Sequence, residues 1–113
     1  MFLYNKNVVI LCSGYKNKFN LEDSFYAGAL AHHLIQSGNY TAECDSVTVA
    51  IDMWLSGKDN IEMYINKSAH RERLRNRGQD DVLEYTFTID NSSALPVLRK
   101  SDKRLIDLSV NKE

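Results

Sequence analysis

The chain has 113 residues, 43% of them hydrophobic and 26% charged, and a formal net charge of −1 at pH 7. This predicts one globular domain over residues 1–113, and it gives no support for a nucleic acid or a membrane as partner. The longest uninterrupted apolar run, residues 8–12, is too short to span a bilayer. The N-terminus lacks the features of a signal peptide, and Cys12 and Cys44 are typical of free thiols, so we expect a cytoplasmic location.

The first predicted element is a buried strand over residues 7–13, where Val-Val-Ile-Leu forms a continuous branched run bounded by Gly14. A helix is predicted from Leu21, because Asn20 is a good N-cap and Gly38 is a suitable stop. The apolar face predicted for this helix consists of Ala27, Leu30, Ala31, Leu34 and Ile35.

A second helix is predicted from Asp45 or Ser46 to Gly57, because apolar residues recur there at i, i+3, i+4 and i+7. These apolar residues are Val47, Ala50, Ile51 and Trp54. A third helix is predicted to open at Asp59 and to stop near Gly78. The side chains expected to point inward from it are Ile61, Tyr64 and Ile65.

The pattern changes near residue 84, where the run Glu-Tyr-Thr-Phe-Thr-Ile predicts a strand over residues 84–89. Residues 96–99 and 104–108 predict a C-terminal β-hairpin across Lys-Ser-Asp-Lys. The order of a strand, three helices and short strands indicates an α/β fold, specifically a layered α/β/α-type half-domain. One early strand makes a thin sheet for three helices, so we expect further strands to be supplied from elsewhere.

Two adjacent carboxylates, Glu22 and Asp23, stand at the predicted start of the first helix. Acids in a first turn favour the helix macrodipole by about 0.3–1 kcal/mol each, and Asp23 resembles the acid of a capping box with Asn20. Carboxylates at a strand-to-helix junction also suit Mg²⁺, which takes one or two carboxylates together with waters and substrate phosphate oxygens. The pattern leaves both interpretations open.

Cys12, Ser13 and Gly14 end the predicted strand beside that helix. A phosphatase with a cysteine nucleophile needs backbone N–H groups and an arginine, but the loop CSGYKNK contains lysines and no arginine. We therefore interpret Cys12 as a small residue packed at the strand end, while Gly14 is placed to help present backbone donors to an anion. A reactive Cys12 thiol is a further alternative, and it requires rapid alkylation near neutral pH.

A basic segment follows at residues 66–78, with Lys67, Arg71, Arg73, Arg75 and Arg77. Lys67, Arg71 and Arg75 share one helical stripe, which is typical of a solvated basic face. The alternative is that one arginine turns inward and clamps a phosphate or a sulfonate. His70 is either a surface histidine or an acid or base.

Together these residues resemble the C-terminal half of the 2-phosphosulfolactate phosphatase family. The family's C-(A/S)-G…F-x-x-E-D…A-G pattern is matched by Cys12, Gly14, Phe19, Glu22, Asp23, Ala27 and Gly28. Weaker matches follow in CDSVTVAIDMW, SAH, DVLEY and LPVL, so the resemblance covers nearly the whole chain. Two departures are Asn17, where the family usually has glycine, and Arg71, which follows His70 where the family commonly has glycine.

The resemblance implies a Mg²⁺-dependent phosphoric monoester hydrolase that converts 2-phospho-3-sulfolactate to 3-sulfolactate and phosphate, in coenzyme M biosynthesis or sulfolactate metabolism. The residues expected to act in catalysis are Glu22 and Asp23. The expected metal ligands are Asp23, Glu22 and Asp45, and the alternative role of Asp45 is a helix N-cap. The residues expected to line the substrate pocket, with backbone N–H groups facing the phosphate, are Cys12, Ser13 and Gly14.

The family's N-terminal half contains a D-x-x-R-(A/S)-(S/T)-(S/T) segment and a T-x-N-G-T segment, and neither has a counterpart in this sequence. If the family's site lies between the two halves, this chain holds part of it. The alternative to an active phosphatase is a non-catalytic remnant or interaction module. Such a half-fold would expose an apolar sheet edge, to be covered in a homo-oligomer or by a partner chain that supplies the missing half.

Overall fold

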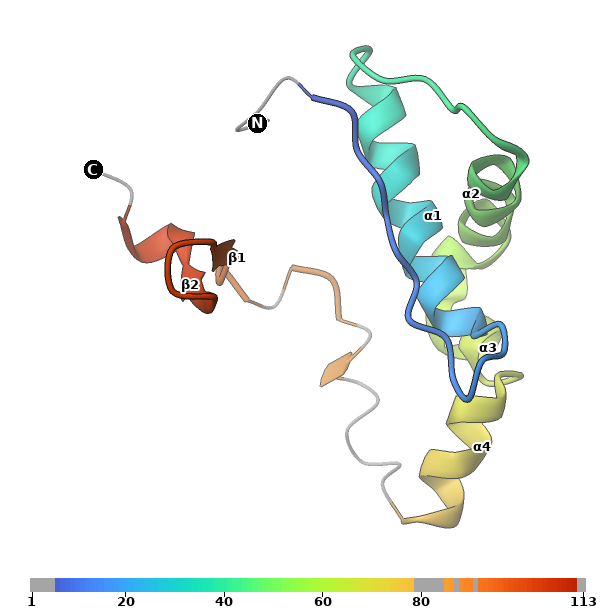
Figure 1. The fold of residues 1–113 in the computed structure, drawn as a ribbon. Helices are drawn as coiled ribbons and strands as arrows, with labels where there is room; N and C mark the ends of the chain where they lie inside the picture. The colour runs from blue at the N-terminus through green and yellow to red at the C-terminus, as the bar shows by residue number, and fades with distance from the viewer. Residues whose placement is uncertain (1–5, 79–84, 87, 91, 112–113) are drawn as a thin grey trace. The chain divides into compact units, whose positions relative to one another are not determined.

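The computed structural model describes residues 6–78, 85–86, 88–90 and 92–111, which belong to two compact units, 1–83 and 84–113 (Figure 1). The helical elements of the first unit are α1 (Leu21–Gln36), α2 (Asp45–Gly57), the 3₁₀ turn η1 (Lys58–Asn60), α3 (Ile61–Ile65) and α4 (Ala69–Asn76). The second unit contains β1 (Pro96–Arg99), β2 (Arg104–Asp107) and the 3₁₀ turn η3 (Leu108–Asn111). None of the helices described is long and apolar enough to cross a membrane.

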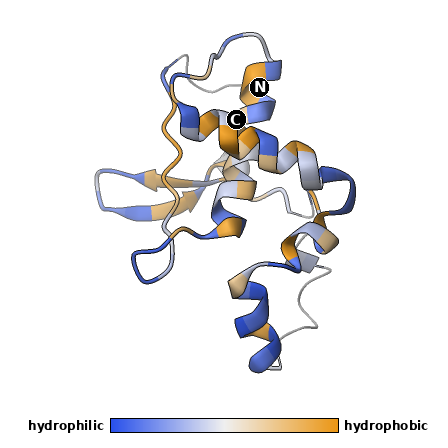
Figure 2. Cartoon of the chain, turned by 90° about the vertical axis from the view of Figure 1, so that its right-hand side faces the viewer, coloured by the Kyte–Doolittle hydropathy of each residue, from blue (hydrophilic) through white to orange (hydrophobic). Residues whose placement is uncertain are grey.

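Residues 7–13 do not form the predicted strand. They run as an extended chain alongside α1 (Figure 1), and much of this segment has the colour of hydrophobic residues in Figure 2. Val9 and Leu11 are 89% and 91% exposed. A strand requires backbone hydrogen bonds to a neighbouring chain, and the described part of the protein pairs no other segment with these residues. The prediction of a buried strand is therefore wrong for this chain by itself.

The boundaries predicted for the first helix are confirmed. The Asn20 side chain accepts a hydrogen bond from the backbone N–H of Asp23 at 3.1 Å, as an N-cap does. At the other end Gly38 has φ +87°, and its N–H donates to the carbonyl of Ile35 at 3.0 Å. Glycine adopts this left-handed conformation without the steric cost that a Cβ brings.

Helices α1 and α2 cross in close contact at Gly28. A Cβ at this position would lie 1.8 Å from the carbonyl oxygen of Ala50. The side chains packed around the crossing are small, since Ala27, Ala31 and Ala50 are all buried. Glycine in mid-helix costs about 0.5–1 kcal/mol relative to alanine, and here it is required by the approach of the second helix.

Replacing Gly28 with alanine is expected to lower the free energy of unfolding by at least about 1–3 kcal/mol, because the Ala50 carbonyl cannot move without shifting α2. Urea denaturation measures the change. Tyr26→Ala is the control, since Tyr26 is exposed on the same helix and its loss should stay within about 0.5 kcal/mol. A Gly28→Ala chain that gains stability would contradict this helix contact.

Aromatic packing closes the other end of the helix pair. The ring of Phe25 packs edge-on against Trp54, with centroids 5.3 Å apart, and stacks on Tyr64 at 4.8 Å. Such pairs contribute about 0.5–1.5 kcal/mol beyond the area they bury. The predicted inward position of Ile65 is confirmed, because it is fully buried.

The predicted third helix is divided into shorter pieces. The Asn60 side chain accepts from the N–H of Met63 at 3.1 Å and caps α3. The Ser68 hydroxyl accepts from the N–H of Arg71 at 3.0 Å and caps α4. Serine and asparagine side chains compete with the helical hydrogen bonds of the backbone, so each of these residues starts a new helix.

The second unit contains the predicted hairpin. Strands β1 and β2 pair antiparallel, from Pro96 opposite Asp107 to Arg99 opposite Arg104. Asp102 in the turn accepts two hydrogen bonds from the Arg99 guanidinium, at 3.0 and 2.6 Å. Helices and a two-stranded antiparallel sheet thus occur in one small chain, which is consistent with the predicted small α/β domain, while the α/β/α layering stays a prediction.

The strand predicted over residues 84–89 falls partly outside the described residues, which omit 84 and 87. Residues 85 and 86 have helical backbone, so these two positions do not follow the prediction.

Candidate functional site

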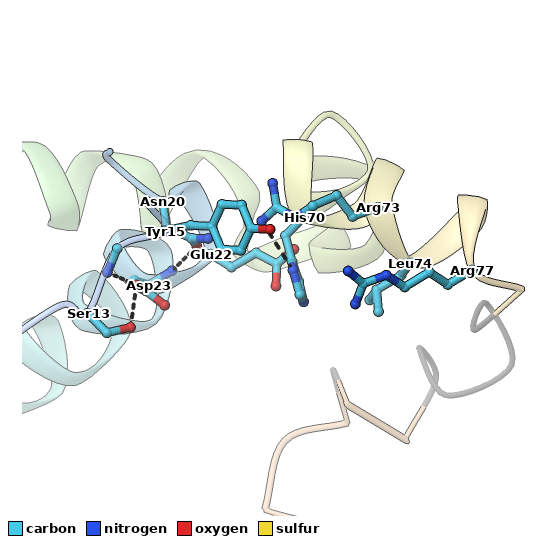
Figure 3. Close-up of a pocket in the computed structure, with 10 residues that line it drawn as sticks. Ser13, Tyr15, Asn20, Glu22, Asp23, His70, Arg73, Leu74 and Arg77 are labelled. Atoms are coloured by element: carbon cyan, nitrogen blue, oxygen red, sulfur yellow. Dashed lines mark hydrogen bonds between the residues drawn. The ribbon is translucent and has the colours of Figure 1, made fainter. Parts of the chain in front are cut away.

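A pocket of about 260 Å³ lies at the N-terminal end of α1 (Figure 3). Its walls come from the loop before α1, from the first turn of α1 and from the face of α4 that meets them. The lining residues are Ser13, Gly14, Tyr15, Asn20, Glu22, Asp23, His70, Arg73, Leu74 and Arg77. The structure therefore brings together Glu22 and Asp23, which were predicted to be catalytic, and the predicted pocket residues Ser13 and Gly14.

A tight turn shapes the loop that enters the pocket. The backbones of Tyr15 and Lys18 exchange two hydrogen bonds of 3.0 Å, and the central residues Lys16 and Asn17 have φ +49° and +61°. Positive φ at both central positions defines a type I′ turn, for which asparagine is well suited. Gly14 has φ +70°, and a Cβ there would lie 2.7 Å from the Lys18 carbonyl oxygen. The turn thus requires glycine at position 14 and directs Tyr15 to the pocket.

Asp23 ties this loop to the helix. One carboxylate oxygen, Oδ2, accepts from the backbone N–H of Gly14 at 2.8 Å and from the Ser13 hydroxyl at 3.3 Å. The Gly14 N–H was expected to face a bound phosphate, but it is occupied by this carboxylate instead. Charge-assisted bonds of this kind are among the stronger hydrogen bonds in proteins, so Asp23 holds the loop in position.

Glu22 connects the starts of two helices. Its Oε1 accepts a hydrogen bond of 2.8 Å from the hydroxyl of Ser68, which is 5% exposed and caps α4. Within the described residues, the second carboxylate oxygens of Glu22 and Asp23 form no hydrogen bond. The two acids therefore each retain one oxygen for a ligand in the pocket.

This pair of acids fits the donor set that Mg²⁺ uses. Magnesium is commonly held by one or two carboxylates and completes its shell with waters and substrate phosphate oxygens. In residues 6–78, 85–86, 88–90 and 92–111, no group of three or more histidine, cysteine and acidic side chains could hold a metal ion. An ion at Glu22 and Asp23 would therefore depend on water and substrate for its remaining ligands.

Asp45 lies at the far end of the helix pair. The contact of Gly28 with Ala50, and that of Phe25 with Trp54, show that α1 and α2 run antiparallel. Asp45 is the exposed first residue of α2, near the C-terminal end of α1, and it does not line the pocket. The structure thus does not bring Asp45 to the other two acids. It is also not the N-cap, since that position belongs to Cys44.

Cys12 is separated from the pocket as well. It is exposed rather than packed, and it lines a larger groove between residues 6–12 and the faces of α1 and α2. The prediction of a packed residue at a strand end is wrong, because the strand that would bury it is not formed. Cys12 and Cys44 are both free thiols, as predicted.

The basic residues that face the pocket are not those of the predicted stripe. The Nζ of Lys67 lies 3.9 Å from the ring centroid of Tyr64, and Nη2 of Arg75 forms an ion pair of 3.2 Å with Oε2 of Glu72. The stripe that lines the pocket consists instead of His70, Arg73, Leu74 and Arg77. These residues are spaced i, i+3, i+4 and i+7, so they share one helix face, and this spacing is visible in the sequence. The sequence near them does not indicate that this face, and not the other, points to the pocket.

Arg73 is held by two neighbours. Its guanidinium carbon lies 3.7 Å above the ring centroid of Tyr15, and its Nη2 lies 3.4 Å from Nδ1 of His70. Within the described residues, neither Arg73 nor Arg77 forms an ion pair with a carboxylate. The pocket therefore has acids on one wall and, on the other, two arginines that no carboxylate of the described residues pairs with. Figure 3 shows the side chains of both walls.

Cys44 is expected to be a reactive thiol. Its hydrogen bond with the Ser46 hydroxyl, 3.1 Å long, and the backbone N–H of Val47 lower the pKa of Cys44. A larger thiolate fraction near neutral pH speeds alkylation. In a Cys12→Ser chain, iodoacetamide labelling followed by mass spectrometry should therefore be fast, and Ser46→Ala should slow it. Equal labelling rates with and without Ser46 would contradict this interpretation.

Comparison with known proteins gives a family match over the region that contains the pocket. The family model of 2-phosphosulpholactate phosphatase matches residues 3–101. The chain belongs to the 2-phosphosulpholactate phosphatase family. The match includes the loop, both acids and all of α4, so every residue that lines the pocket lies within the family's region.

Curated relatives carry the same name. A probable 2-phosphosulfolactate phosphatase of Prochlorococcus marinus is 31% identical over 99 residues, which are 85% of this chain and 41% of that protein. One of Nostoc punctiforme is 31% identical over 103 residues, 85% of this chain and 42% of that protein. The chain thus spans about two fifths of the length of these relatives. No solved structure matches it.

Proposed function

We propose that this chain carries part of the site of a Mg²⁺-dependent phosphatase, which hydrolyses 2-phospho-3-sulfolactate to 3-sulfolactate and phosphate in coenzyme M or sulfolactate metabolism. The observation that carries the proposal is the pocket in which Glu22 and Asp23 face His70, Arg73 and Arg77. The family name supports a phosphatase. The proposal includes a cytoplasmic location, which the two free thiols support.

The acidic residues of the pocket would bind the metal, and the basic residues would bind the substrate. Glu22 and Asp23 bind the metal through the carboxylate oxygens that Ser68 and Gly14 leave unbonded. When bound, Mg²⁺ supplies neutralisation of charge on the phosphoryl oxygens. The arginines of the opposite wall add N–H donors to the anionic substrate. The bonds to Ser68 and Gly14 hold both acids in position before the substrate arrives, which limits the entropy lost on binding.

Hydrolysis forms a bond from a water oxygen to phosphorus and breaks the bond from phosphorus to the ester oxygen. The departing alkoxide must gain a proton and the attacking water loses one, so proton exchange with solvent water balances the step. Arginine only donates hydrogen bonds, so Nδ1 of His70 accepts in the contact with Arg73 and the ring carries its proton on Nε2. This Nε2–H is a further hydrogen-bond donor to the anionic substrate beside the two arginines.

A second candidate function is an interaction module that needs a partner to complete the site. The observation in its favour is the exposed apolar segment at residues 7–12 and the groove beside it. An extended, unpaired backbone with apolar side chains is a template for pairing with another strand. We propose that it pairs with strands from the part of the family's length that this chain does not span.

Phosphate release from 2-phospho-3-sulfolactate tests the first function directly. The chain would be assayed with Mg²⁺ and with EDTA, alone and mixed with a polypeptide that carries the unmatched part of the Prochlorococcus marinus relative. Turnover by the chain alone would show that this pocket is sufficient for hydrolysis of the phosphate ester. Turnover in the mixture only would support the partner proposal. A folded mixture without turnover would count against the phosphatase.

A further inference from the structure

The cationic wall of the pocket presents donors from one face of α4. His70 and Arg73 lie on the helix, and Arg77 follows its last residue. All three line the pocket together with Tyr15 (Figure 3). Neither arginine is neutralised by a carboxylate within the described residues. The guanidinium groups of Arg73 and Arg77 can therefore bind an anion in the pocket.

Tyr15 determines how Arg73 meets a ligand. A guanidinium stacked on an aromatic ring lies parallel to it and donates hydrogen bonds through its edge. The separation of 3.7 Å from the ring centroid is that of direct stacking. The contact of 3.4 Å with His70 restrains the guanidinium from a second side. The type I′ turn fixes the backbone of Tyr15, so Arg73 is oriented before a ligand binds.

We propose that His70, Arg73 and Arg77, aligned by Tyr15, form a subsite for the sulfonate of the substrate, separate from the phosphoryl end at Glu22 and Asp23. The subsite rests on the function proposed above for the phosphoryl end. Tyr15 acts as a positioning residue, because it touches Arg73 and not the anion. Arg73 and Arg77 contact the sulfonate and determine specificity.

A sulfonate suits these donors better than a carboxylate does. It offers three oxygens in a tetrahedral arrangement, whereas a carboxylate offers two in a plane, and three side chains converge on the pocket from this wall. A sulfonate also stays ionised where a weaker acid would take up a proton. The cavity of about 260 Å³ lies just below the range of sites for drug-sized ligands, so it suits a small metabolite.

The subsite can be tested without turnover. Isothermal titration of the full chain in EDTA would compare 3-sulfolactate with malate, its carboxylate counterpart, and with lactate, which lacks the second anion. We expect 3-sulfolactate to bind most tightly. Binding of malate with equal affinity would overturn the preference for sulfonate, and equal binding of lactate would overturn the subsite altogether.

Variants identify the residues involved. Arg73→Ala and Arg77→Ala should each weaken 3-sulfolactate binding by about ten- to a hundredfold, the range for charged hydrogen bonds. Tyr15→Phe keeps the ring and should bind as before, whereas Tyr15→Leu should weaken binding. Arg75→Ala is the matched control, because Arg75 pairs with Glu72 and does not line the pocket.

Arg73→Lys covers the case in which Arg73→Ala does not fold. Lysine keeps the charge but loses the planar fork, so binding should still fall. Unchanged affinity in folded Arg73→Lys and Arg77→Ala chains would overturn the subsite. Failure of the phosphatase proposal gives a different result, namely 3-sulfolactate binding in EDTA with no phosphate release in Mg²⁺.

Discussion

Replacing Asp23 with asparagine is expected to abolish Mg²⁺-dependent phosphate release, with a loss of about a hundredfold or more. The amide oxygen still accepts from the Gly14 N–H, so the loop stays attached to the helix. The negative charge that we propose attracts the cation is lost. Substitutions of groups that merely support metal ligands already cost about 10–100-fold, and a direct ligand should matter at least as much. The assay is phosphate release by whichever form of the protein shows turnover.

Stability separates this role from a purely structural one. The free energy of unfolding of Asp23→Asn should change by less than about 1 kcal/mol, because its hydrogen bond is retained. Asp45→Asn is the matched control: it removes the same charge at a helix start outside the pocket and should leave activity unchanged. If Asp45→Asn loses as much activity as Asp23→Asn, the metal is held elsewhere. The affinity for Mn²⁺, which uses similar oxygen ligands, can be measured by titration without turnover. It should fall in Asp23→Asn and stay unchanged in Asp45→Asn.

The features that could be predicted from the sequence are those determined by neighbouring residues. Asn20 and Gly38 bound α1 because a cap and a left-handed glycine act within one helical turn. The pattern alone left the role of the two acids at its start open, and the family resemblance made them a candidate site. The C-terminal hairpin is equally local, since its two strands flank a short turn.

The features that were missed depend on distant residues. Residues 7–13 have the composition of a buried strand, but a strand forms only where another chain supplies hydrogen bonds. Which arginine enters the pocket depends on how α4 is oriented, and this follows from the break at Ser68 and its bond to Glu22, 46 residues earlier. The role of Asp23 in holding Gly14 likewise depends on the path of the loop.

Replacing both Val9 and Leu11 with aspartate is expected to abolish association with the partner that we propose supplies the rest of the family fold. Both side chains are almost fully exposed, so the isolated chain should keep its stability. Burying each against a partner contributes about 1.5–3 kcal/mol, and the double variant should therefore weaken association by more than about a hundredfold. The partner is the unmatched part of the Prochlorococcus marinus relative, and titration calorimetry measures the affinity.

The matched control places the same two charges on other exposed apolar residues, Val49→Asp with Met63→Asp, which lie on α2 and α3 outside the groove. This control should associate as the unsubstituted chain does. Loss of association in both double variants would mean that added charge, not strand pairing, is responsible.

A second copy of this chain is the competing occupant of the segment. If a dimer forms without the partner and dissociates when Val9 and Leu11 are substituted, the segment serves self-association. Strand pairing with the family's remaining length predicts instead a monomer that becomes a one-to-one complex, because residues 7–12 are a single extended segment that no strand of the described residues pairs with.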